Sequence, residues 1–195
     1  MLGRTDVDTD WWPASTIKIF AAAAALERAE ALGISVRAQL RFDRGARTPY
    51  VRRLDWLVQQ AITHSSNLAY DRLAQFAGHT QMHAGLLGPK RGLGDTALQV
   101  PYSSNIPDLL ESPTINVVDG RQKLTLTAQS GDGVKRCMAS TCTSLNSLSE
   151  IMRRVVLHDR LPAEARLRIK PKALTVLRSA LAGKRARGQE VVHAL

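Results

Sequence analysis

The sequence has few of the features that assign a chain to a familiar class at sight. Aromatic residues make up only 5% of its 195 residues, so the core is expected to be mostly aliphatic. No apolar run approaches the roughly 18 residues of a membrane-spanning helix, and we predict no transmembrane segment. The two cysteines have no histidine near them in the sequence, which is a poor basis for a metal site. We therefore expect neither a metal nor a cofactor.

Acidic residues are also scarce. Asp and Glu number 17 against 27 Lys and Arg, so the formal net charge is +10. A basic chain can bind nucleic acid or an anionic surface, but these residues are spread out, and no recognisable motif with interleaved aromatics accompanies them. The densest run is Lys184-Arg185-Ala186-Arg187. We interpret most of these residues as solvated and expect no nucleic-acid partner; the oligomeric state stays open.

The only two cysteines, Cys137 and Cys142, lie close together in Cys-Met-Ala-Ser-Thr-Cys. A local disulfide across a turn is one interpretation, and it requires an oxidising compartment and suitable geometry. Two buried free thiols are the other, because free cysteine is often part of a core. The sequence leaves both open.

One stretch combines a long apolar run with a reactive pair. Residues 16–32 contain no Gly or Pro and are rich in Ala, Leu, Ile and Phe, which predicts a helix of about five turns that ends at Gly33. From residue 17 to residue 26 the only non-apolar side chain is Lys18. A helix that is apolar all round is buried, so we expect Lys18 to be desolvated and its pKa lowered.

Ser15 lies one helical turn before Lys18 and on the same face. A neutral lysine can take the proton of such a serine, while N–H groups of the first turn help to stabilise a developing oxyanion. Two plainer interpretations remain open. Ser15 can be the helix N-cap, and Lys18 can extend out of the first turn to solvent.

The sequence Pro13-Ala14-Ser15-Thr16-Ile17-Lys18, preceded by Trp11-Trp12, resembles the active-site helix of the class A β-lactamases and penicillin-binding proteins. The resemblance implies that Ser15 is the nucleophile of an acyl-enzyme mechanism and Lys18 its base. It also implies a Ser-x-Asn element between two helices and a Lys-Thr-Gly element on a strand near the C-terminus.

Ser65-Ser66-Asn67 matches the second element. It follows an apolar stripe that predicts a helix over residues 51–63, and it precedes a predicted helix over 68–77, with Asn67 as its cap and Gly78 as its stop. By resemblance, Ser65 relays a proton to the leaving nitrogen and Asn67 contacts the substrate amide. Ser66 stands where class A β-lactamases have Asp.

Two other segments match Ser-x-Asn equally well, Ser103-Ser104-Asn105 and Ser144-Leu145-Asn146. Neither lies between two predicted helices, so the context favours the first match. Residues 79–113 are rich in Gly and Pro and are predicted to be loop. Class A β-lactamases carry in this region a glutamate that activates the deacylating water, and Glu111 is the nearest, but poorly matching, candidate.

The rest of the sequence predicts a hairpin and three helices. Residues 114–118 and 123–127 flank Asp119-Gly120, which predicts a β-hairpin that we interpret as an insertion. Helices are expected from Leu145 to about residue 158, over about 162–169, and through Leu181 to Gly183. No Lys-Thr-Gly or Lys-Ser-Gly occurs, so we expect a fragment of the family fold whose sheet is incomplete.

The resemblance implies an α/β (α+β) fold of the β-lactamase/transpeptidase type, which in this chain is expected to be mostly helical. Residues 1–195 would form a single partial domain, with a helical core over 13–78, a loop and hairpin over 79–135, and C-terminal helices over 144–183. The implied function is a serine hydrolase acting on β-lactam or related peptide amides. The alternatives are a D-alanyl-D-alanine carboxypeptidase, a penicillin-binding protein, or an inactive binding module of the same fold. The resemblance implies a periplasmic or extracellular location and a peptidoglycan-type peptide or β-lactam as partner, although no secretory signal follows Met1.

Overall fold

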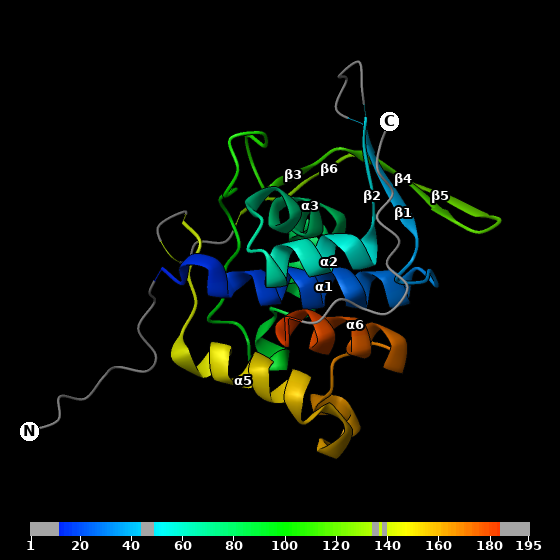
Figure 1. The fold of residues 1–195 in the computed structure, drawn as a ribbon. Helices are drawn as coiled ribbons and strands as arrows, with labels where there is room; N and C mark the ends of the chain where they lie inside the picture. The colour runs from blue at the N-terminus through cyan, green and yellow to red at the C-terminus, as the bar shows by residue number, and fades with distance from the viewer. Residues whose placement is uncertain (1–11, 44–48, 134–136, 138–139, 184–195) are drawn as a thin grey trace, which may run out of the picture.

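The computed structural model describes residues 12–43, 49–133, 137 and 140–183 (Figure 1). Within these ranges the chain is a mixed α+β fold with a small antiparallel sheet. None of the described helices has both the length and the apolar character needed to cross a bilayer. Trp11 and the basic run 184–187 lie outside the described residues.

A buried helix runs through the middle of the fold. A 3-10 turn, η1 (Ala14–Ile17), continues directly into α1 (Lys18–Ala31). Each side chain from residue 17 to residue 26 is at most 5% exposed, which confirms the burial predicted from the apolar run. Gly33 has φ +67°, a left-handed conformation that glycine adopts without steric cost, and the helix ends there as predicted.

Helices cover α1 on two sides (Figure 1). The helices α2 and α3 lie on one side of α1, and α6, with α5 beside it, lies on the other. The bounds of the other helices and turns are α2 (Leu54–Thr63), α3 (Asn67–Ala77), α4 (His79–Ala84), η2 (Pro89–Arg91), α5 (Leu145–Val156), η4 (His158–Arg160), η5 (Ala163–Ala165) and α6 (Pro171–Leu181).

The sheet has the strand order β2-β1-β4-β5, and all neighbours are antiparallel. Leu40 and Phe42 of β1 lie opposite Val117 and Ile115 of β4, and all four are buried on the face toward the helices. The bounds are β1 (Gln39–Asp43), β2 (Tyr50–Arg53), β4 (Thr114–Asp119) and β5 (Gln122–Leu126), with a separate pair β3 (Glu111–Ser112) and β6 (Gln129–Ser130).

The predicted hairpin is confirmed, and its role is larger than an added insertion. Gly120 adopts φ +60° at the turn between β4 and β5. Because β4 pairs with β1 along five residue positions, the hairpin supplies half of the four-stranded sheet. The buried residues of β4 explain this, since they need the apolar face of β1 to cover them.

Three secondary-structure predictions from the sequence were wrong in part. Residues 51–53 belong to strand β2 and not to α2, because Arg53 is extended and pairs with Gln39. The expected helix over 162–169 is only the turn η5, after which Arg166 is extended and its Nε donates to the carbonyl of Leu161. Residues 79–113, predicted to be loop because they are rich in glycine and proline, contain the short helix α4.

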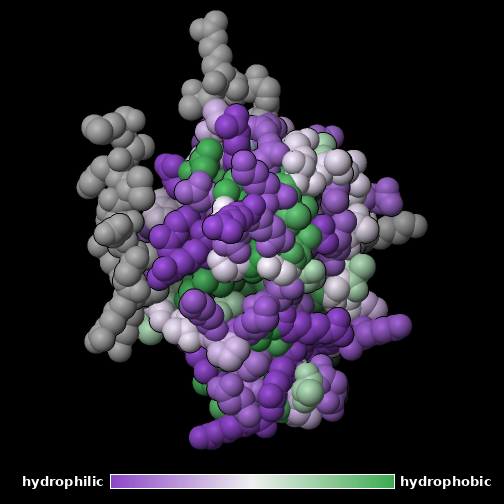
Figure 2. All heavy atoms as spheres, turned by 90° about the vertical axis from the view of Figure 1, so that its right-hand side faces the viewer, coloured by the Kyte–Doolittle hydropathy of each residue, from purple (hydrophilic) through white to green (hydrophobic). Residues whose placement is uncertain are grey.

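The face seen in Figure 2, on the β4–β5 side of Figure 1, is largely hydrophilic, and apolar residues are visible only between polar ones. This agrees with the interpretation of the charged residues as solvated.

Candidate active site

Three predicted site residues come together with Lys18. Ser15 lies in η1, Lys18 is the first residue of α1, and the connection from α2 to α3 carries Ser65 and Asn67. Lys18 Nζ lies 3.2 Å from Ser15 Oγ, 3.0 Å from Ser65 Oγ and 2.8 Å from Asn67 Oδ1. Ser65 Oγ lies 2.8 Å from Ser15 Oγ, so the two hydroxyls also contact each other. The four side chains form one continuous hydrogen-bonded cluster.

The plainer interpretations of Ser15 and Lys18 fail in this structure. Ser15 caps no helix: α1 is preceded by Ile17, and neither η1 nor α1 has a side-chain cap at its start. Lys18 does not extend to solvent, since it is 1% exposed. Ser15 and Ser65 are exposed, so the hydroxyls face solvent while the amine between them is covered.

Burial lowers the pKa of Lys18 from the ordinary value of 10.5, and the charge of Asp71 raises it by a smaller amount. None of the hydrogen bonds that the Lys18 amine makes ends on a carboxylate. Its partners are neutral oxygens, which stabilise an ammonium less than a directly paired anion does. Burial and the lack of a directly paired carboxylate therefore both act to lower the pKa of Lys18.

The hydrogen-bond geometry of Lys18 Nζ is compatible with both the charged and the neutral form of the amine. Two partners of Lys18 can only accept: the backbone carbonyl of Ser65 and the Oδ1 of Asn67. A neutral amine has two N–H groups for these acceptors and one lone pair left over. As an ammonium, Lys18 donates to the hydroxyl oxygens of Ser15 and Ser65; as a neutral amine, it can accept a proton from either hydroxyl through this lone pair.

Backbone strain is concentrated at the same place. Ala14, which precedes Ser15, has φ +47°, and Ser65 has φ +52°. Non-glycine residues in this conformation cost on the order of 1–3 kcal/mol each, and such residues cluster at functional sites. In the described residues the remaining non-glycine example is Cys137. Two of these conformations therefore lie directly before Ser15 and at Ser65 itself.

A cavity of about 410 Å³ opens onto Ser15. Its walls include two aromatic side chains in edge-to-face contact, Trp12 and Tyr102, with ring centroids 6.2 Å apart. Asn67 lines the same cavity, whereas Lys18 lies behind it, with its Nζ 6.0 Å from the Tyr102 ring centroid. The full lining is Trp12, Ala14, Ser15, Asn67, Val100, Pro101 and Tyr102.

Asp71 holds the loop that carries Tyr102, a role that the sequence analysis missed. It is fully buried in α3, and its carboxylate accepts hydrogen bonds of 2.8 Å from the backbone N–H groups of Tyr102 and Ser103. Burial raises the pKa of Asp71 despite these bonds. The sequence held one clue, since an Asp on the apolar side of a predicted helix needs partners.

The structure separates the other candidates from this cluster. Ser103 contributes its N–H to Asp71, and Ser144 is the N-cap of α5, so neither of these Ser-x-Asn matches meets Lys18. Glu111 lies in β3 and lines a different cavity, with Gln75 donating to its carbonyl. The predicted cap of α3 is also corrected: Ser66 Oγ accepts from the N–H of Ala69, and Asn67 is the first helical residue.

The two cysteines form a disulfide, Cys137–Cys142, with Cα atoms 5.8 Å apart, which decides between the two interpretations of the sequence. Cys142 also pairs with Ala97 through two backbone hydrogen bonds. The side chain of Thr141 accepts from the N–H groups of Gln99 and Val100. The disulfide-bonded segment thus supports the strand-like stretch that leads into the cavity wall at residues 100–102.

Comparisons of the chain with protein-family models, with curated proteins and with solved structures found no match.

Proposed function

We propose that this protein is a serine hydrolase of the β-lactamase and penicillin-binding type, which forms an acyl-enzyme on Ser15. One observation carries the proposal: a buried lysine with a lowered pKa lies within hydrogen-bond distance of two exposed serine hydroxyls and an asparagine amide. The fold assignment to the β-lactamase/transpeptidase type rests on the Ser-x-x-Lys and Ser-x-Asn elements and belongs to the same proposal.

The first half of the reaction follows from the cluster. Ser15 Oγ attacks the carbonyl carbon of a β-lactam or peptide amide while its proton passes to the neutral Lys18 Nζ. The C–N bond then breaks. The leaving nitrogen takes a proton from Ser65 Oγ, which is replenished by the Lys18 ammonium 3.0 Å away. An ester between the acyl group and Ser15 remains, and Lys18 is neutral again.

The second half requires a water molecule and a base to hydrolyse that ester. The described lining of the cavity contains no carboxylate, and Glu111 lines another cavity. Lys18 is then the base nearest to Ser15 in the described part of the chain. We therefore propose that acylation is faster than deacylation, as in a penicillin-binding protein, and that the acyl-enzyme accumulates.

The experiment is intact-mass spectrometry of the full chain after incubation with benzylpenicillin, beside a Ser15→Ala variant and a circular dichroism measurement of folding. The proposal expects the mass of one penicillin to be added to the parent chain and none to the variant. A folded parent chain that gains no mass would reject acylation of this substrate class. In that case a binding module of the same fold, which keeps the cavity without the chemistry, would be favoured.

A further inference from the structure

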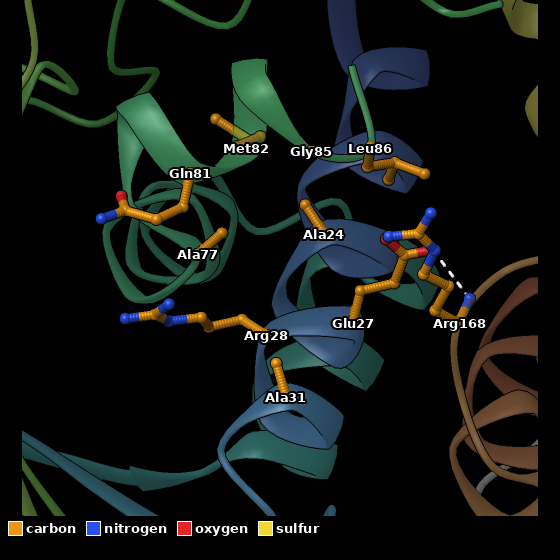
Figure 3. Close-up of a pocket in the computed structure, with 10 residues that line it drawn as sticks. All are labelled: Ala24, Glu27, Arg28, Ala31, Ala77, Gln81, Met82, Gly85, Leu86 and Arg168. Carbon is orange, nitrogen blue, oxygen red and sulfur yellow. Dashed lines mark hydrogen bonds between the residues drawn. The ribbon is translucent and has the colours of Figure 1, made fainter. Parts of the chain in front are cut away.

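A second cavity, of about 330 Å³, lies toward the other end of α1, where this helix meets α4 (Figure 3). Its volume is near the lower end of the range for cavities that hold small ligands. The floor is apolar, and several of its side chains are buried in the core. The lining consists of Ala24, Glu27, Arg28, Ala31, Ala77, Gln81, Met82, Gly85, Leu86 and Arg168.

Arg28 differs from the other arginines at this level of burial. Every other described arginine that is buried or half-buried has a hydrogen-bond acceptor for its guanidinium. These are Arg53, Arg72, Arg91, Arg154, Arg166 and Arg178. Arg28 is half-buried, and its Nε is shielded from solvent without a partner among the described residues. Arg91 and Arg154 also have shielded N–H groups without a partner, but another nitrogen of each guanidinium has an acceptor. The Arg28 guanidinium is therefore available to an anion that is not part of the described chain.

The nearby carboxylate of Glu27 does not compensate this charge. Its Oε1 accepts from Arg91 Nη2 at 2.9 Å and from the backbone N–H of Arg168 at 2.8 Å. The other charged group in the lining, Arg168, is positive and exposed. The charged residues of the lining therefore sum to a net positive charge, and Arg28 has no ion-pair partner among the described residues.

The polar groups are arranged at two ends (Figure 3). Arg28 and Gln81 extend in the same direction, whereas Glu27 and Arg168 lie on the other side of α1. Gln81 Oε1 is also buried without a partner. Between the two ends lie the apolar side chains of the floor. A ligand that fits this arrangement has an anionic group at one end and a short apolar body.

We propose that this cavity binds a small aliphatic carboxylate, with its carboxylate at the Arg28 guanidinium and its chain over Ala77 and Met82. Guanidinium and carboxylate form paired, charge-assisted hydrogen bonds, and the partly shielded position strengthens them relative to water. The site lies away from Ser15 and does not depend on the proposed hydrolase activity.

The experiment is an isothermal titration of the full chain with hexanoate, with 1-hexanol and hexylamine as probes that keep the tail and change the head. The proposal expects saturable binding of hexanoate that weakens at least tenfold in Arg28→Gln. Arg160→Gln removes the charge of an exposed arginine outside the cavity and is the matched control, with binding unchanged. Ser15→Ala is expected to bind hexanoate like the parent, which excludes binding at the serine site.

A second variant narrows the cavity from its rim. Ala31→Leu enlarges an exposed residue of the lining, so folding is expected to be retained while hexanoate binding is lost. The proposal is overturned if the parent chain shows no saturable binding, if hexylamine or hexanol binds as tightly as hexanoate, or if neither Arg28→Gln nor Ala31→Leu weakens binding.

Discussion

Lys18 and Arg28 lie on the same helix, yet their surroundings are opposite. Lys18 is almost fully buried and makes hydrogen bonds to neutral oxygens on two elements of the chain. Arg28 is half-buried, and its guanidinium has no acceptor among the described residues. A lysine in such a place can lose its proton, whereas an arginine stays charged, so Arg28 remains a cation that an external anion can pair with. A shielded lysine is thus a candidate base, whereas a shielded arginine is a candidate group for binding an anion.

The largest effect is expected when the Lys18 amine is removed. Lys18→Met keeps the length of the side chain but has no lone pair, and loss of a general base typically reduces a rate by about 10²–10⁴-fold. We expect acylation of Ser15 by benzylpenicillin, followed by intact mass over time, to slow by that amount. Lys172→Met, at an exposed lysine of α6, is the control and is expected to acylate at the parent rate. Equal rates in the two variants would reject Lys18 as the base.

A third basic group, His79, is also buried, and its lowered pKa is expected to make the stability of the protein depend on pH. Its ring is buried beside His83, with ring centroids 4.2 Å apart, and burial followed by the His83 charge lowers the pKa of His79 to about 4. The unfolded chain therefore binds more protons between pH 6.5 and 4, so stability falls as pH falls through this window.

We expect the parent chain to lose up to about 3 kcal/mol more than His79→Gln over this window, by urea unfolding at each pH. Exposed His64→Gln is the control and should follow the parent. If the parent and His79→Gln have the same pH dependence, the assignment of the effect to His79 is wrong.

The Asp71 carboxylate affects the pKa of Lys18 through its charge and not through a hydrogen bond. Its charge raises the pKa of Lys18, so Asp71→Asn is expected to lower that pKa further and to shift the rise of the acylation rate with pH toward lower pH. The variant also leaves one of the N–H groups of Tyr102 and Ser103 without its acceptor, at a cost of about 1 kcal/mol of stability. If the midpoint of the acylation rate against pH is unchanged in Asp71→Asn while stability drops, Asp71 only holds the loop and does not affect the pKa of Lys18.

The smallest effect is expected at Arg28. Because its guanidinium has no partner to lose among the described residues, Arg28→Gln should change the free energy of unfolding by less than about 0.5 kcal/mol, the usual range for surface substitutions. Arg91→Gln should cost clearly more, since Arg91 is buried and paired with Glu27. Urea unfolding of the two variants compares them directly, and similar losses would mean that Arg28 makes stabilising contacts after all.

Much of the helical framework could be predicted because it depends on local patterns. The apolar run from residue 17 to residue 26 predicted a buried helix, and Gly33, Gly78 and Gly183 marked helix ends at which each glycine has positive φ. The boundary of α2 could not be predicted in this way. Residues 51–53 fit the apolar stripe of a helix, but pairing with β1 draws them into the sheet.

Within the candidate site, the sequence placed Ser15 one turn before Lys18, and the two flanking predicted helices favoured Ser65 and Asn67 over two other Ser-x-Asn matches. Whether this match lies beside Lys18 is another question, since Ser65 and Lys18 are 47 positions apart in the sequence. Sequence spacing cannot settle this, because it depends on how α1, α2 and α3 pack. Asp71, Trp12 and Tyr102 joined the site through the same packing, and no short motif marks them.

The composition of the core, the helix that carries Ser15 and Lys18, and the hairpin turn at Gly120 follow from the sequence alone, because each depends on residues that are close together in the chain. The chemical surroundings of those residues depend on how the segments pack. Packing brought Ser65 and Asn67 to the buried Lys18 and left Arg28 without an acceptor among the described residues. Hydrogen bonds between distant segments help to set the pKa of a lysine, and they do not exist until the segments pack.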